Sequence, residues 1–204
     1  VITPVIEATE VFIRSAGENS DIVGKEMYVF KDRGDRQIAL KPESTASVMR
    51  MVVENKLYVA PGVKKYYYLS PNFRYERPQA GRQRQFHQFG IETLGSDKPS
   101  IDAEVIALAV QFFNELGLKN LETCINSVGC PTCRAEYNKK LKEYLDAKSD
   151  VLCETCNERK EKNPMRVIDC KNPVCKENLS DIPYMIDHLC DDCKDHFEKV
   201  KVYL

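Results

Sequence analysis

All nine cysteines of this 204-residue chain lie after residue 120, and eight of them form four closely spaced pairs. The paired residues are Cys130 and Cys133, Cys153 and Cys156, Cys170 and Cys175, and Cys190 and Cys193. The first residues lack the pattern of a secretion signal, so we expect a cytoplasmic protein whose thiols stay reduced. In such a compartment, clustered cysteines indicate metal binding rather than disulfides.

The spacing of the pairs predicts two structural zinc sites. Two thiolates from one tight turn can bind one Zn²⁺, and a second pair completes the tetrahedral ligand set. The middle pairs read C-x2-C-x13-C-x4-C, which would leave the first and last pairs to form the other site. Pairing in sequence order is equally allowed, and eight reduced thiols in a small core are the alternative to metal binding. We expect Cys124, which lies in a predicted strand, to pack in the core.

The overall composition is that of an ordinary globular protein, with 43% hydrophobic residues, 30% charged residues and a formal net charge of −1. No run of about eighteen apolar residues occurs, so we expect no membrane span and no membrane partner. With so small a net charge, contact with nucleic acid would have to come from local basic patches. Residues 131–175 hold ten Lys/Arg against eight Asp/Glu, a weak excess that a solvated surface explains equally well.

Hydrophobic periodicity predicts an α+β fold, in which an antiparallel sheet carries helices. Alternating and aromatic-rich segments predict strands at 26–32, 36–42, 64–77, 85–92 and 121–128. Helical spacing predicts helices at 44–55, 100–117 and 134–148. The tetrapeptide Asp32-Arg33-Gly34-Asp35 is a turn signal that makes the first two strands a hairpin. After Cys130 the chain becomes helical and charged, so we expect a small helical, Cys-rich domain there.

The segment from Asn72 to Glu92 predicts a second hairpin with an unusual side-chain content. It holds four arginines and no lysine, and residues two apart in a strand share one face. One face therefore carries a guanidinium, an aromatic ring, an amide and two carboxylates, from Arg74, Glu76, Phe86, Gln88 and Glu92. We expect Gly90, on the same face, to leave space in which a ligand can lie against the strand.

Such a face suits a nucleoside triphosphate. Arginine binds phosphate oxygens in a fixed fork and stays charged, and the face of a Phe ring can stack on a nucleobase. We therefore expect the base on Phe86 and the phosphates near Arg74 and Arg82. The alternative is a solvated hairpin held by cross-strand salt bridges.

Three blocks of the chain resemble the class II aminoacyl-tRNA synthetases, and specifically the histidyl-tRNA synthetase family. FRYERP (73–78), GRQRQFHQFG (81–90) and Glu92 resemble the family's motif 2. LKPESTAS (40–47) is similar to its histidine-binding turn, and ITPVIE (2–7) to the end of motif 1. The helix that precedes this end of motif 1 would form a dimer interface, so the resemblance implies a homodimer in the full-length protein.

The resemblance also implies residue roles. It implies histidine-binding roles for Glu43, Ser44, Thr45, Arg74, Gln88 and Glu92. It implies ATP-binding roles for Arg74, Glu76, Arg82 and Phe86. Arg74 would be the catalytic cation at the α-phosphate, with Mg²⁺ bridging phosphates. For Glu43, a carboxylate that stabilises the N-terminus of the following helix is an equally good interpretation of the residues alone.

The resemblance implies a histidine–tRNA ligase, which activates L-histidine with ATP and transfers it to tRNA(His). Residues 1–128 would be part of the class II catalytic core, and residues 129–204 a Cys-rich insertion domain. We find no later arginine block, motif 3, tyrosine-containing lid or anticodon-binding domain in the 204 residues. We therefore expect an interior piece of the enzyme that is inactive by itself.

Two other functions stay open. One is the synthetase-like regulatory subunit of ATP phosphoribosyltransferase, which shares the fold and senses histidine. The intact set of polar residues in the second hairpin, together with the Cys-rich segment, favours the enzyme over it. The other is a zinc-ribbon RNA-binding module, which explains residues 130–204 but leaves the hairpin unexplained.

Overall fold

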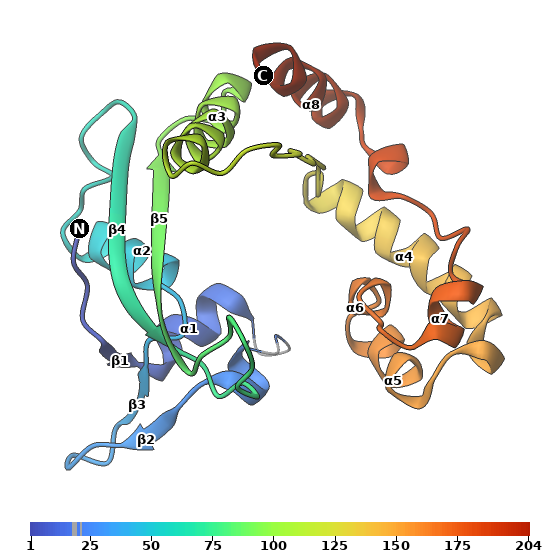
Figure 1. Cartoon of the computed structure of the whole chain (residues 1–204), viewed down its shortest axis with the longest axis horizontal. Coiled ribbons are helices and arrows are strands. Elements are labelled where there is room, and N and C mark those ends of the chain that lie inside the picture. The colour runs from blue at the N-terminus through green and yellow to red at the C-terminus, as the bar shows by residue number, and fades with distance from the viewer. Residues whose placement is uncertain (18–19, 21) are drawn as a thin grey trace. The chain divides into compact units, whose positions relative to one another are not determined.

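The computed structural model describes residues 1–17, 20 and 22–204, which divide into two compact units, Val1–Asp97 (unit 1) and Lys98–Leu204 (unit 2). Unit 1 contains β1 (Ile6–Ala8), α1 (Thr9–Ala16), a π-helical turn (Ile22–Glu26), β2 (Val29–Lys31), β3 (Gln37–Leu40), α2 (Thr45–Glu54), β4 (Lys64–Phe73) and β5 (Gln85–Leu94). Helices accompany antiparallel strands, as Figure 1 shows, so the predicted α+β class is confirmed.

A three-stranded sheet of order β1-β3-β2 forms from the first predicted hairpin and the strand before it. The hairpin turn closes on Asp32, whose Oδ1 accepts the backbone N–H groups of Gly34 (2.8 Å) and Arg36 (3.0 Å). Ala39 of β3 is buried with Phe12 of α1 and Ala46 of α2. Through this small apolar cluster, both helices pack against the sheet.

The second hairpin pairs β4 with β5 from Lys64 opposite Leu94 to Phe73 opposite Gln85. The predicted pairing is confirmed, although β4 ends four residues earlier than the predicted 77. It ends there because the N–H of Tyr75 bonds to the carbonyl of Glu26 (2.7 Å) instead of to β5. On the inward face of β4, alternate side chains are buried, and this face forms the floor of the candidate site.

Unit 2 is helical. It contains α3 (Pro99–Glu115), α4 (Pro131–Ala147), α5 (Glu154–Lys162), α6 (Met165–Ile168), α7 (Pro173–Asn178) and α8 (Asp191–Tyr203), with 3₁₀ turns at Ser149–Val151 and Met185–His188. Proline occupies the first turn of α3 and α4, where its missing N–H costs nothing. Tyr137, Leu141 and Leu145 recur every four residues and bury one face of α4, the helix predicted at 134–148.

The predicted strand at 121–128 is wrong, because these residues have no regular secondary structure. A strand needs a neighbour that takes up its backbone hydrogen bonds, and no described strand pairs with this segment. The expected packing of Cys124 in the core is also wrong, because its side chain is exposed.

The two units of the structure divide after Asp97, whereas the boundary predicted from the sequence lies between residues 128 and 129. Helix α3 groups with unit 2 because it packs on α8, with Asp102 Oδ2 lying 2.7 Å from His196 Nε2. The division of the chain into 1–128 and 129–204 stays a prediction.

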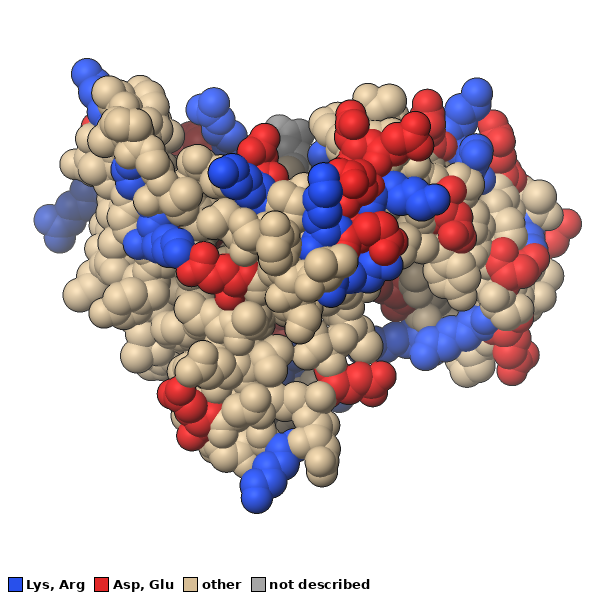
Figure 2. All heavy atoms as spheres, turned by 90° about the horizontal axis from the view of Figure 1, so that it is seen from above, with Lys and Arg blue, Asp and Glu red and all other residues tan. Residues whose placement is uncertain are grey.

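Two surface properties bear on possible partners. On the face drawn in Figure 2, basic and acidic side chains are intermixed and neither sign gathers into a single field. Among the described helices, none combines the length and the apolar character that crossing a membrane requires.

Candidate functional site

The candidate site begins where the N-terminus of α2 meets the inward face of β5. Thr45, the first residue of α2, donates its hydroxyl to Glu92 Oε1 at 2.7 Å. Glu43 lies just before the helix, and its carboxylate accepts the backbone N–H groups of Thr45 (2.6 Å) and Ala46 (2.9 Å). Glu43 therefore caps the positive end of α2, which is the alternative role considered for it.

The side chain of Tyr68 occupies the space beside Gly90 that was expected to be free for a ligand. The two residues face each other across the hairpin, and a Cβ on Gly90 would lie 2.1 Å from Cζ of Tyr68. The expectation of free space is therefore wrong, because the glycine makes room for a protein ring. Tyr68 was not among the predicted site residues, although its position opposite Gly90, on the face of the hairpin that carries Gln88 and Glu92, was a usable signal.

The pKa of Glu92 is raised above its ordinary value of 4.5, mainly because burial disfavours the charged carboxylate. The Thr45 hydroxyl acts in the opposite direction, and the nearby charge of Glu43 adds to the rise. Burial also raises the pKa of Tyr68, whose hydroxyl interacts with Thr45 and Glu92. The carboxylate thus sits in a half-buried polar pocket, where a hydrogen-bond donor from a ligand would be strongly preferred.

Ser44 and Gln88 meet through Asn72 rather than at the ligand-facing surface that carries Arg74, Gln88 and Glu92, which is called the cleft from here on. The hydroxyl of Ser44 is buried, 2.8 Å from Ser70 Oγ and 3.1 Å from Asn72 Oδ1. Gln88 accepts Asn72 Nδ2 on its Oε1 at 2.5 Å. The structure does not bring the Ser44 side chain to a ligand-facing position, whereas Gln88 is half-buried at the floor.

Arg74 connects the turn before α2 to the aromatic residue of β5. Its Nε donates to the carbonyl of Pro42 at 2.9 Å, and its guanidinium carbon lies 5.4 Å from the ring centroid of Phe86. The two side chains thus lie together, in the range of a cation–π contact.

Glu76 and Arg82 form an ion pair with each other. Arg82 Nε lies 3.0 Å from Glu76 Oε2, and the arginine side chain is 55% exposed. Arg84 lies over the ring of Tyr75 at 4.3 Å. This part of the hairpin therefore shows the salt-bridged arrangement that was the alternative to nucleotide binding. A nucleotide bound here would exchange the ion pair for contacts with its own base and phosphates.

The eight paired cysteines gather into two clusters of four, and the pairs are nested. The outer cluster holds Cys130, Cys133, Cys190 and Cys193, and the inner cluster holds Cys153, Cys156, Cys170 and Cys175. The sulfur atoms of each cluster lie within 4.8 Å of one another. Of the two pairings that the spacing allowed, the structure has the nested one.

The sulfur geometry fits a tetrahedral metal site. Zn–S bonds of about 2.3 Å in a tetrahedron place the sulfurs about 3.8 Å apart. Cys130 and Cys133 have their Sγ atoms 3.5 Å apart, and Cys153 and Cys170 have theirs 3.9 Å apart. All eight thiols are free, so no disulfide competes for them.

Backbone N–H groups support thiolates in both clusters. Cys133 Sγ accepts the N–H of Cys190 at 3.1 Å, and Cys175 Sγ accepts that of Cys153 at 3.2 Å. The backbone N–H of Cys133 lowers the pKa of the Cys130 thiol to about 6.

The other thiols with a shifted pKa differ in the direction of the shift. The backbone N–H of Cys156 lowers the pKa of Cys153 to about 7. Burial, by contrast, raises the pKa of Cys156 and of Cys175, and the Cys190 side chain and burial raise that of Cys193 to about 12. Thiolates this close repel one another, and a divalent cation would remove that repulsion.

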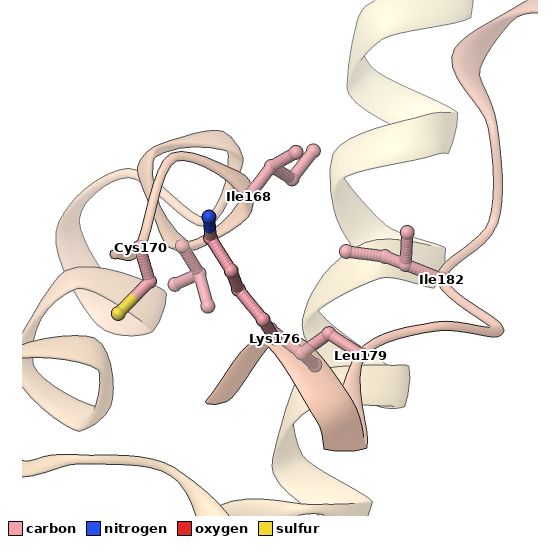
Figure 3. Close-up of a pocket in the computed structure, with 6 residues that line it drawn as sticks. Ile168, Cys170, Lys176, Leu179 and Ile182 are labelled. Carbon is pink, nitrogen blue, oxygen red and sulfur yellow. The ribbon is translucent and has the colours of Figure 1, made fainter. Parts of the chain in front are cut away.

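A small cavity of about 110 Å³ lies beside the inner cluster. Its lining includes Ile168, Leu179 and Ile182, and the side chain of Lys176 runs across it (Figure 3). Figure 3 also shows the sulfur of Cys170 pointing away from Lys176. The cavity therefore borders the inner cluster through Cys170, and its other lining residues apart from Lys176 are apolar and offer no further ligand.

The two histidines of unit 2 have partners other than the cysteines. His196 Nε2 lies 2.7 Å from a carboxylate oxygen of Asp102, and His188 Nδ1 lies 3.3 Å from Lys140 Nζ. Neither histidine belongs to the two groups of four thiols.

Several basic side chains of residues 131–175 are paired with acids. Lys142 bridges Asp146 and Glu161, and Lys160 reaches Asp146 at 2.9 Å. Such pairing is typical of a solvated, mixed-charge surface, which was the alternative to a basic patch that binds nucleic acid.

Comparison with known proteins defines the class. The crystal structure of apo S. aureus histidyl-tRNA synthetase superposes on the whole chain with a TM-score of 0.73 at 37% identity, over 45% of its own length. An ATP phosphoribosyltransferase regulatory subunit/histidyl-tRNA synthetase from Bacillus halodurans C has a TM-score of 0.60 at 20% identity, which shows a shared fold alone. The fold is thus that of the synthetases and their structural relatives.

Sequence comparison identifies the family. The family model of histidyl-tRNA synthetase matches residues 1–149. Histidine–tRNA ligases of Clostridioides difficile and Desulfitobacterium hafniense are 69% and 56% identical over 204 and 202 residues. The chain spans about half of these relatives, 49% and 48% of their lengths. The chain belongs to the histidyl-tRNA synthetase family.

Proposed function

We propose that this chain is part of a histidine–tRNA ligase, which activates L-histidine with ATP and transfers it to tRNA(His). The hydrogen bond between Thr45 and Glu92 is the observation that carries the proposal. It joins the histidine-binding turn to motif 2, two blocks far apart in sequence, around a half-buried carboxylate. Identity of 69% to a curated histidine–tRNA ligase supports the same activity.

In this proposal Glu92 reads the imidazole ring of histidine. Imidazole offers an N–H donor, and an apolar side chain in its place would leave part of the half-buried carboxylate unpaired, so apolar side chains are disfavoured. Thr45 and Glu43 face the α-amino group, although Glu43 also caps α2. Gln88 contacts the main-chain end of the amino acid.

Arg74 is the proposed catalytic cation for the first step. The histidine carboxylate attacks the α-phosphate of ATP, and pyrophosphate leaves. A guanidinium aimed at the α-phosphate stabilises the charge that develops there. Phe86 would stack on adenine and Glu76 would read its edge, while Arg82 would reach the terminal phosphates. Mg²⁺, when bound with ATP, would supply further charge neutralisation at the phosphates.

The two cysteine clusters are proposed as structural zinc sites. Four thiolates complete a tetrahedron and leave no open position for catalysis. The outer cluster would tie the start of α4 to the start of α8, and the inner cluster would hold α5 and α7 together. The full-length protein is further proposed to be a cytoplasmic homodimer.

Histidine-dependent exchange of pyrophosphate into ATP tests the proposal in the full-length protein. The reaction should require L-histidine and should not proceed with L-glutamine or L-phenylalanine. A protein that binds histidine in calorimetry but shows no exchange would instead act as a histidine sensor. That outcome would support the regulatory-subunit alternative, which has the fold but not the sequence identity on its side.

A further inference from the structure

Beneath the cleft, three polar side chains are buried almost completely. Ser44 and Asn72 are 0% exposed, and Ser70 is 4% exposed. Ser44 precedes α2, whereas Ser70 and Asn72 lie on the inward face of β4 in the β4–β5 hairpin (Figure 1). Buried polar groups cost free energy unless they are hydrogen-bonded, so the partners of these three residues define what they do.

The hydrogen bonds of these residues run in one direction. Asn72 Oδ1 can only accept, so the Ser44 hydroxyl must donate in their 3.1 Å contact. Ser44 has no second proton, so Ser70 donates in the 2.8 Å contact between the two hydroxyls. Asn72 Nδ2 then donates to Gln88 Oε1 at 2.5 Å. The order of donation is Ser70 to Ser44 to Asn72 to Gln88.

This order fixes which end of the Gln88 amide is left for the cleft. The carbonyl oxygen of Gln88 is taken by Asn72, so the NH₂ group is the end that can bind a ligand. Glu92 lies four residues further along β5, on the same face with Gly90 between them, and offers carboxylate oxygens that accept. The floor therefore presents a donor and an acceptor on one face.

We propose that Asn72, supported by Ser44 and Ser70, is a positioning residue that orients the Gln88 amide to donate to the carboxylate of the amino-acid substrate. This inference rests on the proposed function, because it takes an amino acid as the ligand. Asn72 touches no substrate and acts through Gln88. Ser44, Ser70 and Asn72, which the reaction itself does not use, thereby gain a role.

The physical need for such a device comes from the amide group itself. The two ends of a glutamine amide have almost the same shape, so packing alone does not select between its two orientations. A flipped Gln88 would turn its carbonyl oxygen toward the substrate carboxylate, and two acceptors would then repel each other. The buried network selects the attractive orientation before the substrate arrives, which lowers the cost of binding.

Two substitutions of Asn72 separate positioning from simple packing. Asn72→Asp keeps the shape and the bond from Ser44, but it offers only acceptors when ionised. Gln88 must then donate its NH₂ group to the aspartate and present its carbonyl oxygen to the cleft. Asn72→Leu keeps a similar volume, releases Gln88 and avoids burying a charge. Calorimetry would measure the Kd of each variant for L-histidine and for L-histidinol, whose CH₂OH group replaces the carboxylate.

We expect Asn72→Asp to weaken L-histidine binding by about tenfold or more, since an attractive contact becomes a repulsive one. L-Histidinol binding should change by about twofold or less, because its hydroxyl can donate to a carbonyl oxygen. Asn72→Leu should weaken L-histidine binding by less than Asn72→Asp does, because it releases the Gln88 amide without reversing it. Equal losses for the two ligands in both variants would show a merely structural role and overturn the proposal.

Amide resonances of Gln88 in ¹⁵N spectra give a readout that needs no ligand. In the parent chain the Gln88 NH₂ protons should exchange freely with water, and in Asn72→Asp they should become protected. Protected Gln88 protons in the parent would overturn the proposal whatever the ligand results. A parent chain that shows free Gln88 protons but binds no histidine would confirm the amide orientation and count against the proposed function instead.

Discussion

The cleft of unit 1 and the Cys-rich part of unit 2 differ in what interacts with their buried polar atoms. In the cleft, Ser44, Ser70 and Asn72 hydrogen-bond to one another and to Gln88. In unit 2, four of the eleven residues of the buried cluster are cysteines, whose sulfurs lie next to other sulfurs. Neutral donors and acceptors can satisfy one another, whereas clustered thiolates need a cation.

The difference teaches that the two regions depend on different partners. The cleft is complete in its own atoms, so its order should not depend on metal. The buried cluster of the Cys-rich part holds Tyr137, Leu141 and Leu145 of α4 together with four other apolar side chains, and its remaining four members are cysteines. A domain as small as this one often needs an additional source of stability, such as a metal.

The largest expected effect is the loss of a cysteine from the inner cluster. Cys156 is 0% exposed and belongs to that cluster. Cys156→Ser should release one zinc ion per chain, and structural zinc contributes on the order of 10 kcal/mol in small domains. The helical signal of unit 2 in circular dichroism should fall. Elemental analysis gives the zinc count.

The matched control is Cys124→Ser, which removes an exposed thiol outside both clusters. It should keep two zinc ions per chain and the helical signal. If the two variants behave alike, the clusters do not hold the metal, and the contrast between the two regions is lost.

Arg74→Lys should affect the cleft as a loss of rate rather than of stability. Lysine is a point charge without the planar fork that holds a phosphate and a carboxylate together. In the full-length protein we expect adenylate formation to slow about a hundredfold, which corresponds to about 2.7 kcal/mol. Single-turnover kinetics measures this rate. An unchanged rate would leave Arg74 as a residue that merely packs on Phe86.

Glu92→Gln should lower histidine selectivity by roughly 2–3 kcal/mol, because the imidazole N–H loses a charged acceptor. Pyrophosphate exchange with L-histidine against L-glutamine measures this selectivity. Discrimination equal to that of the parent would remove Glu92 from the imidazole-reading role.

The same substitution has a pH signature in stability. The pKa of Glu92 is higher in the folded state than in the unfolded state. Glu92 therefore stabilises the fold fully at pH values below its unfolded-state pKa, and this stabilisation is lost as the pH rises through its folded-state pKa. The parent should therefore lose unfolding free energy over a window above pH 4.5, and Glu92→Gln should not. Tm values at pH 4 and pH 8 test this. A steeper loss in the variant would contradict the sign.

Gly90→Ala should have the smallest effect, on the order of 1 kcal/mol of unfolding free energy in unit 1. The added Cβ would lie 2.1 Å from the hydroxyl oxygen of Tyr68, so the ring must move away from Thr45 and Glu92. Gly24→Ala is the control, because a Cβ there meets nothing within 4 Å. Denaturant unfolding of both variants should separate them. Equal stability would mean that the ring moves without cost.

Sequence alone predicted the long periodic elements and not the way in which side chains meet. The hairpins and α4 follow from alternation and four-residue spacing, which local physics enforces. The strand at 121–128 failed because strand formation depends on a neighbour that the segment itself does not encode. Gly90 was misread because only the hairpin register shows that Tyr68 lies opposite it.

The candidate site shows the same limit. Spacing placed Glu92 and Gln88 on one face, as the register confirms. The spacing could not show that the Ser44 side chain lies buried below this face and hydrogen-bonds to Asn72 instead of facing a ligand. The cysteine spacing predicted two groups of four but left nested and sequential pairing equal, since the choice depends on how α4 and α8 come together.

The most direct test of the contrast between the two regions is hydrogen exchange with and without a zinc chelator, on protein whose zinc content has been measured. The account predicts two zinc ions per chain. After chelation, residues 130–196 should lose protection, while β4, β5 and α2 keep theirs. No zinc in protein purified under reducing conditions, with residues 130–196 still protected, would contradict the account and leave the thiols as ordinary core residues.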